Sequence, residues 1–256
     1  MLEQIVAKQK LSLEKTMREV PLAAFERKIE KRGGAFGQKI KKAGWALIAE
    51  CKLASPAKGT LCPGKTVEEL ARVYENSGAA ALSVHTNGHF LGKAQDLAAV
   101  REITDLPVMR KEFIIHPYQI YETAYLKADA LLLIARILDR KRLAEFIAEA
   151  GGLGLDCLVE AHDEADIDKS LDAGAGIIGI NNRDLTNFAT DLEVSLRLLP
   201  QCAGKPAVSE SGIKSGEDAA LLKEAGFKGV LVGEALVTAG DIGQKTREMA
   251  LKEAGQ

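Results

Sequence analysis

Residues 128–161, "ADALLLIARILDRKRLAEFIAEAGGLGLDCLVEA", contain two apolar runs on either side of a helical pattern. The runs "ADALLLIARI" and "LDCLVEA" are apolar at most positions, which is typical of strands that are buried on both faces. Between them, "DRKRLAEFIAEAGG" places apolar residues three and four apart and ends on two glycines, as an amphipathic helix does. The stretch therefore predicts a strand, a crossover helix and a second, parallel strand.

The same alternation of apolar runs and helical patterns continues along the rest of the chain. Six further runs bring the predicted strands to eight: "WALIAE", "AALSVH", "LPVMRKEF", "GIIGINN", "KPAVSES" and "GVLVGEA". The helical patterns between them include "TVEELARVYENSG", "PYQIYETAYLKA", "DEADIDKSLDAG" and "SGEDAALLKEAG". Eight such units favour the α/β class and a (β/α)8 TIM barrel over an open doubly wound sheet.

The length of the chain indicates its domain organisation. A chain of 256 residues suits one barrel, and no linker or shift of composition marks a second domain. We therefore expect a single barrel domain over residues 1–256. Residues 1–44 precede the first strand and include the amphipathic pattern "IVAKQKLSLEKTM", which predicts an N-terminal helical extension that covers one end of the barrel or its mouth.

Composition and charge argue against nucleic acid and membranes as partners. A net charge of −2 and a pI near 6.2 give no reason to expect nucleic acid or an anionic membrane as the partner. No apolar stretch reaches the roughly 18 residues of a membrane span, and the amino terminus lacks the apolar centre of a signal peptide, so we expect a cytoplasmic protein.

The four cysteines lie far apart, which favours reduced thiols. His85 and His89 are close in sequence, but Gly88 between them argues against a helix that presents both to a metal ion.

Charged residues recur at the carboxyl ends of the predicted strands. Side chains two apart share a face of a strand, so Glu50 and Lys52 lie on one face and Cys51 on the other. The same parity pairs Lys111 with Phe113, Leu158 with Glu160, Asn181 with Arg183, and Val208 with Glu210. An unpaired charge is costly inside a filled barrel, whereas barrel enzymes assemble their reacting groups at this end of the strands. We therefore interpret the charged groups as the acids and bases of an active site rather than as a structural ring of ion pairs.

The last two predicted strands carry a second signal. "SESGIKSGED" places a Ser-Gly turn before a helix, and "VGEAL" places Gly233 where another group can approach the backbone closely. Backbone N–H groups at such turns hold phosphate, and barrels commonly build this site after strands seven and eight. The pattern predicts a phosphate-bearing small-molecule ligand.

Several motifs resemble one known family over nearly the whole chain. They are "ECKLASPAKG", "LPVMRKEFII", "PYQIYE", "ADALLLIARIL", "LGLDCLVEAHDE", "IIGINNRDLTNF", "VSESGI" and "VLVGEAL", in the order and spacing of the indole-3-glycerol phosphate synthases of tryptophan biosynthesis. The resemblance implies a carboxy-lyase that closes an anthranilate-derived ribulose phosphate to indole-3-glycerol phosphate with loss of CO2 and water. It implies acid and base catalysis without a cofactor or a metal ion.

The resemblance also implies a role for each matching residue. Lys111 would be the general acid on the ketone, Glu160 would transfer protons, and Lys52 would hold the substrate carboxylate or donate a proton in the dehydration. The orienting residues would be Glu50, Asn181, Arg183 and Glu210. The phosphate would be bound by Ser211, Gly212, Gly233 and Glu234. The loop beside Lys52 would be shaped by Ser55 and Pro56, and the aromatic pocket walled by Phe113, Leu132 and Ile134.

Positions that depart from the pattern of the family include Ala57, which replaces a usual serine, and two histidines. His85 stands where the family has an apolar residue, which leaves the lining near the second strand open. His116 stands where an acid generally precedes "PYQI", so we expect a weaker helix cap there.

Three other functions remain as alternatives. A phosphoribosylanthranilate isomerase would need a catalytic Cys at the first strand and an Asp at the sixth, whereas Cys51 points outward and Asn181 stands at strand six. A Schiff-base aldolase would use Lys111 or Lys52, and a phosphosugar-binding barrel would not react at all. We expect a monomer, with an oligomer left open.

Overall fold

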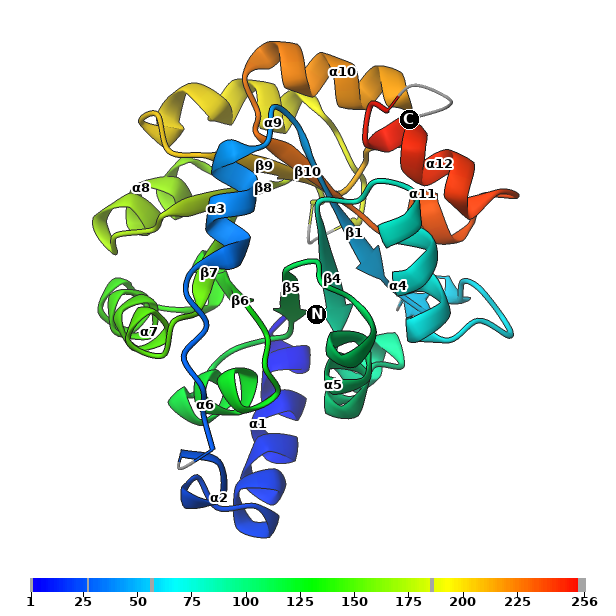
Figure 1. Cartoon of the computed structure of the whole chain (residues 1–256). Coiled ribbons are helices and arrows are strands. Elements are labelled where there is room, and N and C mark those ends of the chain that lie inside the picture. The colour runs from blue at the N-terminus through cyan, green and yellow to red at the C-terminus, as the bar shows by residue number, and fades with distance from the viewer. Residues whose placement is uncertain (1, 27, 56–57, 185–186, 253–256) are drawn as a thin grey trace.

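Eight parallel strands close into a barrel surrounded by helices (Figure 1). The structure is a computed structural model that describes residues 2–26, 28–55, 58–184 and 187–252. The strand order around the barrel is β1-β10-β9-β8-β7-β6-β5-β4, so strands that follow one another in the chain are neighbours in space and β10 closes onto β1. The predicted α/β class and TIM barrel are confirmed.

The barrel strands coincide with the eight apolar runs. They are β1 (Ala46–Cys51), β4 (Ala81–His85), β5 (Val108–Lys111), β6 (Ala130–Ile134), β7 (Asp156–Ala161), β8 (Ile177–Asn181), β9 (Ala207–Glu210) and β10 (Gly229–Val232). A short antiparallel hairpin, which the sequence did not indicate, follows the first strand: β2 (Ala54–Ser55) and β3 (Gly59–Thr60).

Helices precede the barrel and connect its strands. Before the barrel come α1 (Leu2–Glu19), α2 (Ala23–Glu26) and α3 (Ala35–Lys42). Within it are α4 (Val67–Asn76), α5 (Ala94–Ile103), α6 (Pro117–Tyr125), α7 (Arg140–Gly152), α8 (Glu164–Asp172), α9 (Glu193–Leu198), α10 (Gly216–Ala225), α11 (Glu234–Val237) and α12 (Ile242–Met249). The described residues also form the short 3-10 helices η1 (Gly88–Phe90), η2 (Ala135–Ile137) and η3 (Leu199–Cys202). Among the described helices, none combines the length and the apolar character that crossing a membrane requires.

The helix α3 closes the amino-terminal end of the barrel. Phe36 and Ile40 of α3 are fully buried and belong to one apolar cluster with Ala46, Ala81 and Ala130, the first residues of their strands. A separate and larger cluster fills the layer between the strands and the surrounding helices. Because apolar side chains fill the amino-terminal end, the carboxyl ends of the strands are left to form a cavity.

The helices α1 and α2 pack against α6 at the side of the barrel (Figure 1). Leu13, Phe25 and Tyr118 form a small buried cluster, in which the two rings meet edge to face with centroids 5.1 Å apart. The hydroxyl of Tyr118 donates to the carbonyl of Val20 at 2.8 Å, which fixes the end of α1. The N-terminal end of α1 reaches the mouth, since Ile5 lines the cavity there.

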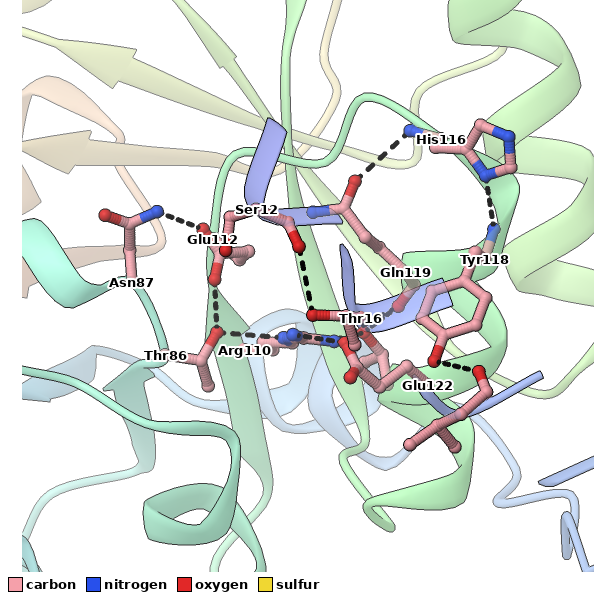
Figure 2. A network of polar contacts seen from close by, with 12 residues as sticks. Ser12, Thr16, Thr86, Asn87, Arg110, Glu112, His116, Tyr118, Gln119 and Glu122 are labelled. Atoms are coloured by element: carbon pink, nitrogen blue, oxygen red, sulfur yellow. Dashed lines mark hydrogen bonds and ion pairs between the residues drawn. The ribbon is translucent and has the colours of Figure 1, made fainter. Parts of the chain in front are cut away.

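The amino terminus of α6 is capped by His116, the residue for which the sequence predicts a weaker cap than an acid. Nδ1 of His116 accepts the backbone N–H of Tyr118 at 3.1 Å, and the Gln119 side chain accepts the backbone N–H of His116 in return (Figure 2). Burial and the charge of Arg142 lower the pKa of His116, so the ring is neutral and can accept at neutral pH. A neutral imidazole therefore takes the capping position that an acid would otherwise occupy.

Candidate active site

A cavity of about 720 Å³ lies at the carboxyl ends of the barrel strands. Each of the eight strands contributes at least one side chain to its wall. Fifteen of the sixteen residues predicted for the site line it: Glu50, Lys52, Ser55, Lys111, Phe113, Leu132, Ile134, Glu160, Asn181, Arg183, Glu210, Ser211, Gly212, Gly233 and Glu234. The sixteenth, Pro56, lies outside the described residues.

Lys111 lies at the centre of the charged groups. Its Nζ is 2.7 Å from Oε2 of Glu210 and 3.3 Å from Oε2 of Glu160, and its side chain is only 14% exposed. Burial lowers the pKa of Lys111, but the carboxylates of Glu210, Glu160 and Glu50 outweigh burial and raise its pKa above the ordinary range. Lys111 is therefore an ammonium ion at neutral pH and can donate a proton or a strong hydrogen bond.

The two carboxylates that share Lys111 titrate differently. Burial raises the pKa of Glu160, but the positive charge of Lys111 and a hydrogen bond from Asn181 bring it below its usual value. For Glu210, burial together with the nearby charge of Glu160 outweighs Lys111 and raises the pKa to about 7. The site thus holds one carboxylate that stays ionised and one that exchanges a proton near neutral pH, which is a common arrangement of acid and base groups.

Glu50 and Lys52 share a face of the chain, as their parity predicts. Nζ of Lys52 is 3.5 Å from Oε1 of Glu50. Burial raises the pKa of Glu50, but the groups around it, first His85 and then Lys52 and Lys111, outweigh burial and hold its pKa well below the usual range. Cys51 between them faces the outer apolar layer, where burial raises the pKa of its thiol.

Polar contacts anchor the two residues that flank Lys111, Arg110 in β5 and Glu112 just after it (Figure 2). Arg110 donates to the hydroxyl of Thr86 at 2.9 Å and pairs with Glu122 at 2.6 Å. Glu112 accepts hydrogen bonds from Thr86 at 2.7 Å and from Asn87 at 2.8 Å. These contacts hold the backbone on both sides of Lys111, so its long side chain leaves the strand from a fixed point.

The loops after β8, β9 and β10 form the remaining wall. Asn181 accepts the backbone N–H of Arg183 at 3.0 Å, and the guanidinium of Arg183 donates to the carbonyl of Phe188 at 3.1 Å. Ser211 and Gly212 both adopt left-handed backbone conformations, with φ of 65° and 80°. A non-glycine residue in this region is uncommon and is often found at functional sites.

The side chain of Glu234 is paired across the mouth. Oε1 of Glu234 accepts a hydrogen bond from Nζ of Lys58 at 2.6 Å, and the two side chains form an ion pair. Burial raises the pKa of Glu234, but the hydrogen bond and the charge of Lys58 bring it below the usual value. The loop after β1 is thereby tied to the start of α11.

The cavity also contains residues that were not predicted, including Ile5, Lys58, His85, Phe90 and His162. His162 lies two residues after Glu160 and could have been found by the same parity. His85 is the last residue of β4 and was noted only as a departure from the family. Ile5 and Phe90 come from elements whose position depends on tertiary packing, so no spacing in the sequence indicates them. Within the described part of the chain, no cluster of three His, Cys, Asp or Glu side chains suits a metal ion.

Comparison with known sequences finds one family. The family model described as indole-3-glycerol phosphate synthase matches residues 2–249. The indole-3-glycerol phosphate synthase of Carboxydothermus hydrogenoformans is 53% identical over 201 residues, which cover 77% of this chain and 76% of that protein. The one of Ruminiclostridium cellulolyticum is 39% identical over 254 residues, which cover 97% of this chain and 98% of that protein.

Comparison with solved structures finds the same fold in more distant proteins. Thiamine phosphate pyrophosphorylase from Pyrococcus furiosus superposes with a TM-score of 0.62 at 17% identity, covering 84% of this chain and 95% of that one. For 3-hexulose-6-phosphate synthase from Salmonella typhimurium the TM-score is 0.64 at 15% identity, covering 80% and 97%. These identities support the fold alone. The family match over residues 2–249 and the close relatives support more: this chain belongs to the indole-3-glycerol phosphate synthase family and has the carboxy-lyase activity of that family.

Proposed function

We propose that the cavity closes 1-(2-carboxyphenylamino)-1-deoxyribulose 5-phosphate to indole-3-glycerol phosphate by general acid and base catalysis. The observation that carries this proposal is the position of Lys111, a largely buried ammonium ion that faces the cavity between Glu160 and Glu210. A proton donor and two carboxylates of different pKa are the groups that ring closure and dehydration require.

In the first step, Lys111 protonates the ketone oxygen of the substrate. The ring carbon that bears the carboxylate then attacks the ketone carbon, and the anilino nitrogen takes up the positive charge as an iminium ion. Glu210, whose pKa is raised to about 7, can return a proton to Lys111 through their 2.7 Å contact. One well-placed acid of this kind contributes on the order of 10²- to 10⁴-fold to the rate.

In the second step, CO2 leaves and the aromatic ring is restored. The bond from the ring carbon to the carboxylate breaks, and its electron pair neutralises the iminium ion. Until then the ammonium of Lys52, held beside Glu50, would pair with the substrate carboxylate and orient it. The iminium ion of the substrate is the electron sink, so in this step the protein needs only to orient the substrate.

In the third step, water is lost from the new five-membered ring. The hydroxyl on the closure carbon leaves with a proton from a lysine, and a base removes a hydrogen from the adjacent carbon. Glu160 is suited to be that base because its pKa is below the usual value and it stays ionised. Lys52 is suited to be the acid, because the substrate carboxylate with which it paired has by then left as CO2.

The rest of the cavity suits the other parts of the substrate. Phe113, Leu132 and Ile134 form an apolar wall for the aromatic ring. Ser55 of β2 and Arg183 of the loop after β8 line the cavity and would face the sugar hydroxyls. The phosphate would be held by backbone N–H groups of the loops after β9 and β10, at Ser211, Gly212, Gly233 and Glu234.

The geometry favours proton transfer over the alternative reactions. A Schiff base needs a neutral lysine, whereas the glutamates around Lys111 raise its pKa. An isomerase that uses Cys51 would need a thiol at the mouth, whereas Cys51 is buried in the outer layer. We propose a monomer that acts in the cytoplasm, where four free cysteines are the normal state.

The variant Lys111→Ala tests the proposal. It removes the acid, so we expect turnover to fall by at least about a hundredfold. Turnover is measured as the gain of indole fluorescence after the ribulose phosphate is added. Thermal unfolding shows that the variant is folded, and Lys223→Ala, on the exposed surface of α10, removes the same charge outside the cavity. If Lys111→Ala kept near-normal turnover, the role of Lys111 would be wrong; borohydride trapping of substrate on the protein would favour the aldolase.

A further inference from the structure

The carboxylate of Glu50 is confined on several sides. Its Oε1 faces Nζ of Lys52 at 3.5 Å. The same oxygen lies against the backbone of Gly233, where a Cβ atom would be only 2.5 Å away. Glu50 therefore fits only because residue 233 is a glycine.

His85 is the group that faces the second carboxylate oxygen of Glu50. Nε2 of His85 is 3.2 Å from Oε2 of Glu50, and the residue is 6% exposed. The imidazole stacks on Phe90, with ring centroids 4.2 Å apart and an interplanar angle of 21°. Among the described residues Nε2 has no well-formed hydrogen bond, so its contact with Glu50 is the one polar interaction available to it. Contacts of this kind are often long before a ligand binds and shorten in the complex.

The surroundings of His85 keep its ring neutral. The charged groups that face it are Glu50 in β1, Lys52 just after β1, and Lys111, its partner in register on β5. Phe90 of η1 covers the ring from the remaining side. Burial lowers the pKa of His85, the carboxylate of Glu50 raises it in part, and the two lysines lower it again, with a net lowering. A neutral imidazole beside an ionised carboxylate carries its hydrogen on the nitrogen that faces the carboxylate.

We propose that His85 is a positioning residue for the reaction: it donates Nε2–H to Glu50 and so holds the carboxylate in the orientation that places the ammonium of Lys52. The inference rests on the proposed roles of Glu50 and Lys52. His85 itself touches no reacting atom in this scheme. Its loss would let Glu50 rotate and would move Lys52 from the substrate carboxylate, which lowers the rate of the chemical steps more than substrate binding.

Two substitutions distinguish the effect of losing the hydrogen-bond donor from the effect of changing the volume of the side chain. His85→Leu keeps an apolar group of similar size and removes the donor, and we expect kcat to fall about tenfold while KM changes less than threefold. His85→Gln places an N–H at nearly the same reach as Nε2, and we expect it to recover most of the loss. His89→Leu is the matched control, because His89 lies exposed on η1 and outside the cavity wall. Thermal unfolding of each variant shows that it is folded.

A double-mutant cycle with Glu50→Gln shows whether His85 acts through Glu50. We expect Glu50→Gln alone to lose turnover, and His85→Leu to cause no further loss in that background. The inference is overturned if His85→Leu keeps wild-type kcat, if His85→Gln is as impaired as His85→Leu, or if His85→Leu lowers kcat by the same factor with and without Glu50. Wild-type turnover in Glu50→Gln would instead overturn the proposed role of Glu50, and the inference with it.

Discussion

At Gly179 the barrel makes room for the carboxylate of Glu210, to which we assign a proton-transfer role. Gly179 lies in β8, and a Cβ atom there would be 2.1 Å from Oε1 of Glu210 on the neighbouring strand. That oxygen is buried and has no hydrogen-bond partner among the described residues. The absence of a side chain at residue 179 therefore leaves room for the carboxylate of Glu210 beside Lys111.

The variant Gly179→Ala is expected to lose activity and keep its stability. The new methyl group displaces the flexible end of Glu210, and a misplacement of about 1 Å in an active site can cost on the order of 10²-fold in rate. Only the end of one side chain has to move, so the midpoint of thermal unfolding should change little. Turnover and thermal unfolding are compared with those of Gly176→Ala, since nothing lies within 4 Å of a Cβ at Gly176. Wild-type kcat in Gly179→Ala would contradict this account of Glu210.

That the charged residues line one cavity could be predicted from the sequence, because their positions follow from strand geometry. Alternation along β1 is enough to place Glu50 and Lys52 on one face, and the carboxyl ends of parallel strands share one edge. His85 could be placed on a strand but not against Glu50, since that contact depends on the register between β1 and β4. The different pKa values of Glu160 and Glu210 depend on burial and on their distances to Lys111, and no sequence pattern reports these.

At the scale of an element, the imidazole of His116 caps α6 and should stabilise that helix. His116→Ala leaves the backbone N–H of Tyr118 without its acceptor, and we expect a loss of about 1 kcal/mol in the free energy of unfolding at pH 8. His116→Asn keeps an acceptor at the same position and should lose less. Both values come from urea unfolding followed by circular dichroism. Equal stability of His116→Ala and the wild type would show that the cap contributes nothing.

The same cap should depend on pH in a definite direction. The pKa of His116 is lowered on folding from 6.5, so the unfolded chain binds more protons between these two pKa values. Stability from this group is therefore present above about pH 6.5 and is lost as pH falls through the folded pKa. His116→Asn does not titrate, so its stability relative to the wild type should improve on going from pH 7.5 to pH 5. A difference that stays constant over this range would contradict a neutral capping histidine.

Most elements could be predicted from sequence because their signals are local. The helical pattern "PYQIYETAYLKA" and the structure agree that α6 begins at Pro117. The hairpin of β2 and β3 was missed because it has two residues in each strand and no alternation to detect. That α3 closes the amino-terminal end of the barrel was also not predictable, since burial of Phe36 and Ile40 depends on the closed barrel.

At the scale of the whole molecule, the number of apolar runs was enough to predict the fold. The position of the cavity followed from the rule that barrel enzymes have their active sites at the carboxyl ends of the strands. Eight apolar runs separated by helices are enough to predict closure, because each repeat adds one strand and the connections are right-handed. The extension at residues 1–44 was predicted to cover one end or the mouth; the structure has α3 at the amino-terminal end and Ile5 of α1 at the mouth. Sequence alone could not separate these roles, because both helices are amphipathic.

Ionisation of the buried Glu210 should lower the free energy of unfolding as pH rises through about 7. Burial raises the pKa of Glu210 to about 7 from an ordinary 4.5, so the folded chain binds more protons than the unfolded chain between these values. Stability from this group is fully present below pH 4.5 and is lost as pH rises through 7. Glu210→Gln removes the titration, so its midpoint of thermal unfolding relative to the wild type should rise steadily between pH 5 and pH 8.

Two comparisons make the Glu210→Gln measurement decisive. Glu217→Gln changes the net charge equally on the exposed surface of α10, and its midpoint relative to the wild type should not vary with pH in this way. Turnover of Glu210→Gln should fall at every pH, because Lys111 loses the carboxylate 2.7 Å away that would return its proton. Greater stability with lower activity is the expected trade-off if a buried charge serves catalysis. If the midpoint of Glu210→Gln fell relative to the wild type as pH rose, Glu210 would be ionised without penalty, and its proposed exchange of a proton near neutral pH would be wrong.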